Sequence, residues 1–412
     1  MKELHSGVCA PKGFRAGGIW CGIKADSRKR DLALIYSERP CVPAAMFTAN
    51  TVKGASLLVT REHVAVGRLH AIIANSGNAN TCTGDAGIKA ARRTAALIAD
   101  EFAISAKSVA VASTGVIGVP LPIAAIESEI SSLADSLCGD AAGHNAALEA
   151  IMTTDTRKKD GAIEIELSGV PVRIGAMAKG SGMIHPNMAT MLCFITTDAN
   201  VSREALEKAL RKAVSHSFNR LTVDGDMSTN DMTLILANGA AGNPPVATEN
   251  ADFAVFSDAL ESLCVSLARK MARDGEGATR LLTVAVRGAT DEAGAEALAK
   301  SVASSSLVKT AIFGADANWG RALCALGYAG VDFDPEKVDM WFASRVGSVL
   351  VCKDSRAAQF SEEEAKKILS EEEVEINIDL TGDFTSGASG AAVVWGCDLT
   401  YDYVKINGEY RS

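Results

Sequence analysis

Aromatic side chains are scarce in this chain of 412 residues, at 5% of the sequence against 48% for hydrophobic residues as a whole. The sequence therefore predicts a core of Ala, Val, Leu and Ile, which is typical of α/β proteins. Positive charge is also in short supply, because 41 Lys and Arg stand against 50 Asp and Glu, for a net charge of −9. A nucleic-acid partner is therefore disfavoured, since no basic excess is available to contact phosphates.

Metal-binding cysteine pairs and targeting segments are also missing from the sequence. Ten cysteines are scattered along the chain, and no two of them form a Cys-x-x-Cys pair. Residues 1–18 have no apolar core of the kind that a signal peptide needs. The long uncharged run 108–126 contains Gly115, Gly118 and Pro120, which favour a strand followed by turns over a membrane helix. We therefore expect free thiols in a soluble cytoplasmic protein with no membrane partner.

The length of the chain predicts two or three domains. From about residue 283 the pattern alternates, with a strand at 284–287, a helix at 292–304, a strand at 309–313 and a strand at 375–380. Ser361 and Glu364 form a capping box for a helix that ends near residue 369. We predict an α/β (α+β) fold, with a larger domain at 1–285 and a smaller α/β domain at 286–412.

Two glycine-containing segments precede the centre of the chain. Residues 71–74 are predicted to end a strand, 75–80 to form a loop and 85–102 to form a helix. This arrangement can cradle a phosphate, but the loop lacks the Lys-Ser/Thr ending of a P-loop, so the signal is weak. Residues 109–112 predict a short strand before a Ser113-Thr114-Gly115 turn, whose hydroxyl and backbone N–H suit an oxyanion. A turn of this kind by itself is usually structural.

The most informative stretch runs from Lys179 to Asp198. Gly180-Ser181-Gly182 is a turn at which backbone can closely approach a ligand, and proline stiffens the next turn, His185-Pro186-Asn187. The apolar run 191–197 predicts a buried strand. Thr190 is thus placed where a loop meets a strand, held by a rigid element and open on its loop side. A lone threonine at such a place is structural far more often than catalytic.

The whole string from Lys179 to Leu192 resembles the self-cleavage site of the ornithine acetyltransferase family, also called the bifunctional glutamate N-acetyltransferases. Residues 222–231 and 275–279 resemble further signatures of this family, so the resemblance covers essentially the full chain. It implies a layered αββα sandwich of the N-terminal-nucleophile type. It also implies that the chain cuts itself between Ala189 and Thr190, and that the new N-terminal Thr190 is the nucleophile.

The resemblance further assigns Thr114 and Gly115 to the oxyanion hole. The residues that it assigns to the amino-acid substrate are Thr153, Lys179, Thr190, Glu276, Asn407 and Ser412. Family members often end in Thr, and the Ser at this C-terminus keeps the hydroxyl and loses a methyl group. His185 lies five residues before Thr190, and we interpret it as structural because the new α-amine already supplies a base.

The reaction that the resemblance implies transfers acetyl from N2-acetylornithine to glutamate, as part of arginine biosynthesis. An amide is exchanged for an amide, so no ATP, metal or cofactor is expected, and the use of acetyl-CoA as a second donor stays open. The implied assembly contains two alpha and two beta segments. Two alternatives also stay open. A hydrolase with the same nucleophile would release acetate without glutamate, and a binding protein that keeps only the fold would stay uncut.

Overall fold

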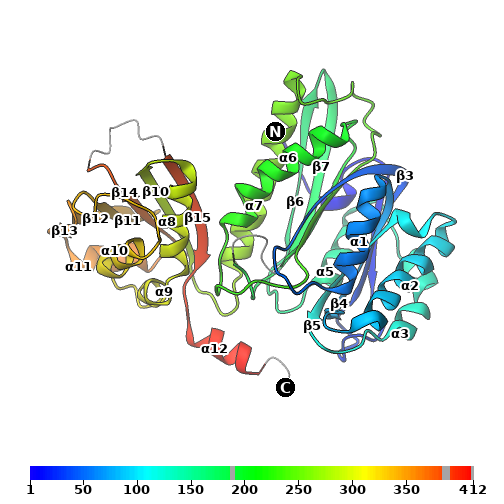
Figure 1. The fold of residues 1–412 in the computed structure, drawn as a ribbon, viewed down its shortest axis with the longest axis horizontal. Coiled ribbons are helices and arrows are strands. Elements are labelled where there is room, and N and C mark those ends of the chain that lie inside the picture. The colour runs from blue at the N-terminus through cyan, green and yellow to red at the C-terminus, as the bar shows by residue number, and fades with distance from the viewer. Residues whose placement is uncertain (186–190, 383–389, 410–412) are drawn as a thin grey trace. The chain divides into compact units, whose positions relative to one another are not determined.

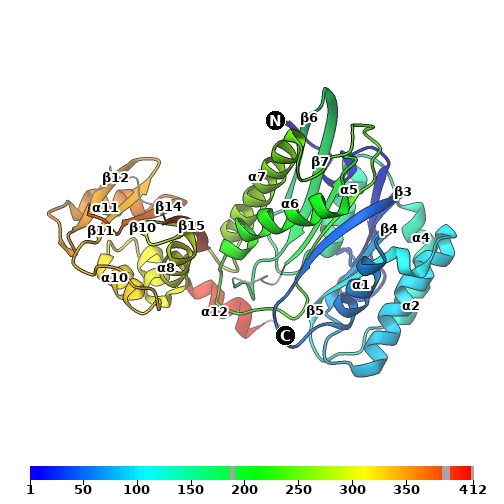
Figure 2. The same ribbon diagram turned by 45° about the horizontal axis from the view of Figure 1, so that its top comes forward.

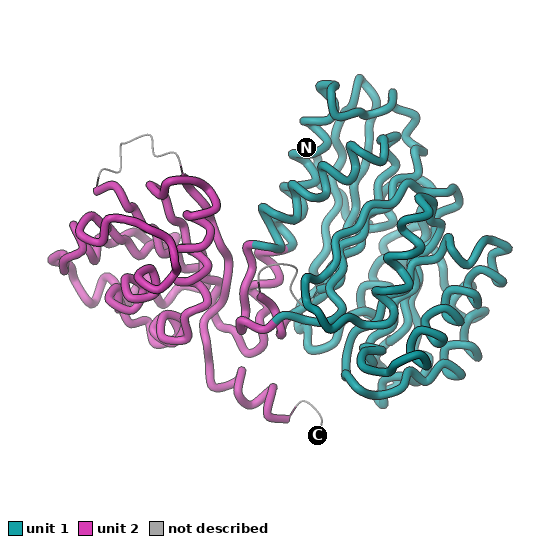
Figure 3. Tube along the Cα trace, in the orientation of Figure 1, with its two compact units in different colours: residues 1–180, 187–219, 227–267 teal, residues 181–186, 220–226, 268–412 magenta. Residues whose placement is uncertain are grey.

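The computed structural model describes residues 1–185, 191–382 and 390–409. The chain divides into two compact units (Figure 3). Unit 1 contains residues 1–180, 187–219 and 227–267, and unit 2 contains 181–186, 220–226 and 268–412. The long C-terminal part of unit 2 begins inside helix α7 (Ala251–Arg273), whereas the sequence-based boundary at 285/286 falls inside strand β10 (Leu281–Ala289).

A sheet of nine described strands forms the centre of unit 1 (Figure 1). Its order is β1-β6-β7-β8-β9-β3-β4-β5, and β2 pairs with β3. The 16-residue β3 joins two halves of this sheet, because its first part pairs with β4 and its last part with β9. The strands of unit 1 are β1 (Lys2–Leu4), β2 (Phe14–Ile19), β3 (Leu32–Phe47), β4 (Leu69–Asn78), β5 (Val109–Val116), β6 (Lys159–Leu167), β7 (Val170–Lys179), β8 (Leu192–Thr197) and β9 (Met232–Ala237).

Helices cover the two sheet halves of unit 1 from opposite sides, with α1 and α2 on one side and α6 and α7 on the other (Figures 1 and 2). The result is an αββα sandwich. The described helices that begin in unit 1 are α1 (Ala55–Val66), α2 (Gly84–Phe102), α3 (Ile123–Glu127), α4 (Ile130–Asp135), α5 (Ala141–Ile151), α6 (Arg203–Ser215) and α7, with 3₁₀ turns η1 (Gly7–Cys9), η2 (Ala106–Ser108) and η3 (Phe218–Arg220).

The layers follow from the alternation of side chains along the strands. Ile35 and Ile72 pack with Phe194 in the core cluster shared by the two sheet halves. Their neighbours Leu34 and Ile73 belong to a second cluster, which includes the side chains of α2. The aliphatic core predicted from the composition is thus split into layers by the strand period of two.

The turn predicted at Ser113-Thr114-Gly115 is wrong, because β5 continues through Thr114 and Gly115 to Val116. Strand β4 likewise continues to Asn78 and includes part of the predicted loop. The two strands run parallel and in register up to the pair Gly77 and Gly115. Gly115 has a φ of +133°, and a Cβ there would lie 2.3 Å from the carbonyl carbon of Gly77. Only glycine lets the two backbones approach this closely, so the strands can extend beyond the point where the sequence predicts a turn.

Unit 2 contains a six-stranded sheet among its described residues, in the order β13-β12-β11-β14-β10-β15. Its strands are β10, β11 (Asp339–Ser344), β12 (Gly347–Lys353), β13 (Arg356–Ala357), β14 (Glu373–Asp379) and β15 (Gly390–Cys397). Its helices are the end of α7, α8 (Glu292–Ser304), α9 (Ser306–Phe313), α10 (Trp319–Gly327), α11 (Glu362–Leu369) and α12 (Tyr401–Gly408). The predicted helix 292–304 and the Ser361 cap, which accepts the N–H of Glu364, are confirmed.

The predicted strand at 309–313 is wrong, because these residues belong to helix α9. Val308 and Ile312 are both buried, four residues apart, on one face of this helix. A short apolar run satisfies both the helical and the strand period, so its sequence cannot decide between them. Across the ranges that the structure describes, no helix is both long and apolar enough to cross a membrane.

Candidate active site

Three of the predicted site residues meet in unit 1. Lys179 ends β7, and its Nζ donates hydrogen bonds to Thr153 Oγ1 at 2.9 Å and to Thr114 Oγ1 at 3.2 Å. The three residues come from β7, from the segment after α5 and from β5. Lys179 and Thr114 are only 3% and 5% exposed, so a buried ammonium group is presented to two hydroxyls.

Asp155 organises this cluster, although no motif in the sequence pointed to it. Its Oδ1 accepts hydrogen bonds from Lys159 Nζ at 2.6 Å and from the backbone N–H of Gly180 at 2.7 Å. Its Oδ2 accepts the backbone N–H of Thr153 at 3.0 Å. Burial raises the pKa of the Asp155 carboxyl, but the charges of Lys179 and Lys159 and the hydrogen bonds from Lys159 and Gly180 together lower it by more, so the pKa lies below its usual range. The ionised carboxylate therefore holds both Thr153 and the backbone that follows Lys179.

A second lysine lies near the same cluster. Lys24 Nζ donates 2.8 Å hydrogen bonds to the carbonyl oxygens of Arg30 and Met152, and Met152 directly precedes Thr153. Burial lowers the pKa of Lys24 to about 8, and the positive charge of Lys179 acts in the same direction. The surroundings of Thr153 are thus rich in cations, which suits an anionic substrate group or an oxyanion.

The proposed cleavage bond, between Ala189 and Thr190, lies outside the described residues. The residues that follow it are well anchored. The predicted strand 191–197 is confirmed as β8, in which Leu192 pairs with Lys179 of β7. The backbone N–H of Met191, the residue after Thr190, donates a 2.9 Å hydrogen bond to Asp231 Oδ1. Strand β8 therefore begins beside the lysine of the cluster.

Two other predicted residues meet in unit 2. Asn407 of α12 donates a 2.8 Å hydrogen bond from Nδ2 to Glu276 Oε2, and the N–H of Glu276 donates to the carbonyl of Ser181. A Cβ at Gly182 would lie 2.3 Å from Glu276 Oε2, so glycine lets this carboxylate approach the turn. Among the described residues the hydrogen-bond partner of the Glu276 carboxylate is the Asn407 amide. Ser412 lies outside the described residues.

The signature at 222–231 serves as an anchor for backbone. Asp224 accepts the N–H groups of Met183 and Ile184, at 2.6 and 2.9 Å. His185 Nδ1 lies 3.4 Å from Thr222 Oγ1, and burial, followed by the charge of Lys300, lowers the pKa of its imidazole.

The described parts of the chain contain no group of three or more His, Cys, Asp or Glu side chains that could hold a metal ion.

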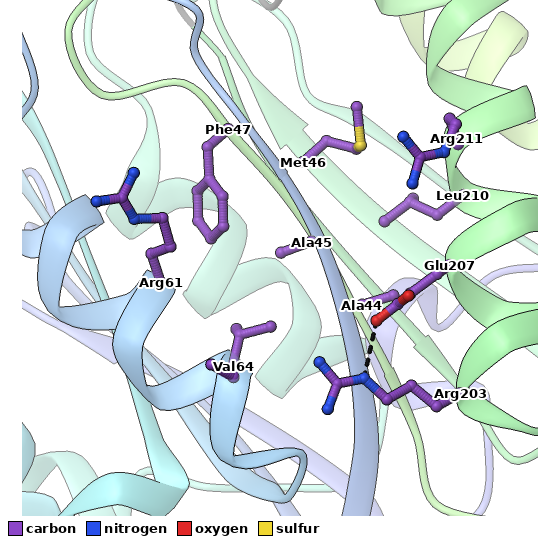
Figure 4. Close-up of a pocket in the computed structure, with 11 residues that line it drawn as sticks. Ala44, Ala45, Met46, Phe47, Arg61, Val64, Arg203, Glu207, Leu210 and Arg211 are labelled. Atoms are coloured by element: carbon purple, nitrogen blue, oxygen red, sulfur yellow. Dashed lines mark hydrogen bonds and ion pairs between the residues drawn. The ribbon is translucent and has the colours of Figure 1, made fainter.

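A pocket of about 240 Å³ in unit 1 is lined by β3, α1 and α6 (Figure 4). Met46, Phe47 and Leu210 give it an apolar part. Arg203 on its rim is paired with Glu207 through a 2.8 Å contact. None of the site residues predicted from the sequence lines this pocket, so the candidate active site is the cluster around Lys179.

Comparisons with known proteins identify the family of the chain. The family model of the ArgJ family matches residues 15–412. The arginine biosynthesis bifunctional protein ArgJ of Symbiobacterium thermophilum is 49% identical over 413 residues, which cover 100% of both chains. ArgJ 1 of Clostridium acetobutylicum is 50% identical over 404 residues, covering 97% of this chain and 96% of its own.

Two solved structures are similar as well. The bifunctional protein ArgJ of Bacillus halodurans is 46% identical, with a TM-score of 0.49, and the match covers 53% of this chain and 98% of that one. An ornithine acetyltransferase of Mycobacterium tuberculosis, solved in complex with ornithine, is 40% identical, with a TM-score of 0.42, and covers 45% and 97% respectively. Because the family model spans nearly the whole chain and full-length relatives share about half of its residues, the chain belongs to the ArgJ family, whose members include the arginine biosynthesis bifunctional proteins.

Proposed function

We propose that this protein is a glutamate N-acetyltransferase that moves acetyl from N2-acetylornithine to glutamate through an ester on Thr190. The cluster of buried Lys179 and Thr114 with half-buried Thr153 carries the proposal, because it places a cation and two hydroxyls beside the start of β8. Family membership supports the reaction class. The ornithine bound to the relative from M. tuberculosis supports an ornithine-like substrate.

Maturation is the first step of the proposed mechanism. Thr190 Oγ attacks the carbonyl carbon of Ala189, the amide becomes an ester, and water hydrolyses the ester. The products are segments of 189 and 223 residues and a new α-amine on Thr190. The unperturbed pKa of such an amine is about 7.7–8.0, so much of it is neutral near pH 7.5. It can then take the proton of its own Oγ when that oxygen attacks a substrate.

Acetyl transfer follows in two half-reactions. Thr190 takes the acetyl group and ornithine leaves, and then the amine of glutamate attacks the acetyl ester. Lys179 Nζ can only donate, so Thr114 Oγ1 accepts from it and keeps its own proton for an oxyanion. The Gly115 N–H would be the second oxyanion donor. These donors act on charge that develops only in the transition state, which lowers the barrier of both half-reactions.

The amino-acid substrate is proposed to contact Thr153, Lys179, Glu276, Asn407 and Ser412. Lys179 suits the substrate carboxylate and Glu276 suits an ammonium group. Within the described residues Glu276 is bonded to a neutral amide, so its negative charge is available for a cationic substrate. We further propose that two alpha and two beta segments form one assembly, which light scattering would test. We also propose that the protein is cytoplasmic.

Product analysis tests the function. Purified protein incubated with N2-acetylornithine and glutamate is expected to form ornithine and N-acetylglutamate in equal amounts. Release of acetate without glutamate would instead show a hydrolase, and an uncut chain that forms no product would show a binding protein. A parallel reaction with acetyl-CoA and glutamate shows whether the protein has a second acetyl donor.

Replacing Thr114 by alanine tests the oxyanion hole. Loss of one oxyanion donor lowers turnover by roughly a hundredfold to a thousandfold in other enzymes, and we expect a similar fall in kcat with a smaller change in KM. Thr114→Ser keeps the hydroxyl and should restore most of the rate. An unchanged kcat in Thr114→Ala would remove Thr114 from the site.

Shortening the C-terminus tests the role of Ser412. Deletion of residues 410–412 leaves helix α12 and Asn407 in place. We expect normal self-cleavage, because the attack needs only Thr190, its preceding bond and the oxyanion donors. Transfer should slow, since misplacing a substrate by about 1 Å can cost roughly a hundredfold. Gel bands report cleavage and ornithine release reports transfer, and a truncated protein with the wild-type transfer rate would contradict the assignment of Ser412.

A further inference from the structure

Asn230 and Asp231 are consecutive buried residues just before β9, and neither was assigned a role by the sequence analysis. Both belong to unit 1, and their side chains bond to different strands. Asn230 contacts backbone that leads to the proposed oxyanion donors. Asp231 contacts backbone that follows the proposed nucleophile.

Asn230 binds the backbone around the end of β5. Its Nδ2 donates to the carbonyl oxygens of Ser113 at 2.8 Å and Ala79 at 2.7 Å. Its Oδ1 accepts hydrogen bonds from the hydroxyls of Thr81 and Thr229, which fix the orientation of the carboxamide. The carbonyl of Ser113 belongs to the same planar peptide unit as the N–H of Thr114. Asn230 therefore holds the peptide that leads into Thr114 and Gly115.

Asp231 binds the backbone at the start of β8. Its Oδ1 accepts the N–H of Met191 at 2.9 Å, and the carbonyl of Met191 accepts the N–H of Met232 at 3.0 Å. The N–H of Met191 lies in the peptide unit that contains the carbonyl group of Thr190. Asp231 therefore anchors the peptide unit on the C-terminal side of the nucleophile.

The sheet alone connects these two places only indirectly. Between β8 and β5 lie three strands, β9, β3 and β4, and β3 bridges the two halves of the sheet. Small changes of twist over these strands would alter the distance between the oxyanion donors and the nucleophile. The dipeptide Asn230-Asp231 connects both strands through two adjacent side chains.

We propose that Asn230 and Asp231 are positioning residues. Asp231 holds the peptide before β8, directly after Thr190 in the chain, and Asn230 holds the peptide that leads into the oxyanion donors on β5, so that together they fix these two peptides relative to each other. This inference rests on the proposed function, because it assumes the roles of Thr190, Thr114 and Gly115. What each residue must supply is specific. Position 230 must supply N–H donors to the Ser113 carbonyl, and position 231 must supply an acceptor for the Met191 N–H, which an amide oxygen can also provide.

Self-cleavage measured over time in cell-free synthesis tests the proposal. Asn230→Ala and Asp231→Ala are expected to slow cleavage roughly a hundredfold, because misplacing a reacting group by about 1 Å can cost that much. Asp231→Asn is expected to recover most of the cleavage rate. In the fraction of each alanine variant that is cleaved, the kcat of acetyl transfer should fall while KM changes little. A purely structural role would not produce this split or the recovery by Asn.

Two buried residues of unit 1 provide matched controls. Asp198, at the far end of β8, accepts the backbone N–H groups of Arg173 at 2.7 Å and Lys12 at 3.0 Å. Asn243 bonds through its side chain to the backbone of Asn200. Asp198→Ala and Asn243→Ala should lower Tm as much as the test variants and still cleave at the wild-type rate. If an alanine variant does not fold, Thr81→Val, which removes one hydroxyl that orients Asn230, should still slow cleavage.

The proposal is overturned if the test variants cleave as fast as their controls. It is also overturned if the controls slow cleavage equally at the same loss of Tm, or if Asp231→Asn fails as badly as Asp231→Ala. Failure of the proposed function gives a different result, because the wild-type protein itself would then fail to transfer acetyl to glutamate.

Discussion

The Thr190→Ala variant is expected to run as one full-length band on a denaturing gel, whereas the wild-type chain gives segments of 189 and 223 residues. Thr190 Oγ is the only attacking group in the proposed mechanism, so its removal should abolish both cleavage and acetyl transfer. Thr190→Ser keeps a hydroxyl and is the matched control, which should still cleave. Two bands from the alanine variant would contradict self-cleavage by Thr190.

The two wild-type segments should stay together in a native gel or a sizing column. The sheet of unit 1 contains strands from both sides of the proposed cut, since β7 pairs with β8 and β3 pairs with β9. Phe194 and Leu234 from the second segment share a core cluster with Ile35 and Ile72 from the first. Separation would expose this apolar surface to water, which is unfavourable.

Replacing Asp155 by alanine is expected to destabilise the protein by about 3–5 kcal/mol, as for other buried ion pairs that lose one partner. The variant removes a carboxylate from two buried lysines and leaves the N–H groups of Thr153 and Gly180 without their acceptor. Glu207→Ala is the control, because it breaks the exposed pair with Arg203, and helical pairs of that kind contribute only about 0.3–0.5 kcal/mol. Urea unfolding curves give both values. Equal losses in the two variants would contradict the organising role of Asp155.

The same carboxylate predicts a pH dependence. Its folded-state pKa lies below the usual range, so its contribution to stability is complete above the unfolded value of about 3.9 and is lost as the pH falls through the folded value. The difference in unfolding free energy between wild type and Asp155→Asn should therefore be constant from pH 5 to 8, and shrink below about pH 4. A difference that grows on acidification would show that the carboxylate is not ionised in the folded protein.

Elements with local signals were predictable from the sequence. The cap of α6 is Ser202, which accepts the N–H of Ala205, three residues away, and the hairpin of β6 and β7 turns at Ser168-Gly169, so both features involve only residues that are close in the chain. Strand β8 was visible as an apolar run between polar segments. Helix α9 was mispredicted, because five residues carry too few periods to distinguish a helix from a strand.

The candidate site follows the same pattern, because part of it was predictable from the sequence and part was not. The sequence by itself determined the family motif around Thr190, and the resemblance based on it predicted that Thr114, Thr153 and Lys179 belong to the site. Only the tertiary structure decided which side chains hold them. Asp155 bonds to Gly180, 25 residues away, Asp231 to Met191, 40 residues away, and Asn230 to Ser113, 117 residues away. A carboxylate or amide has no preferred partner until the strands are paired and the surrounding water is excluded, so its role follows from the fold and not from its neighbours in the chain.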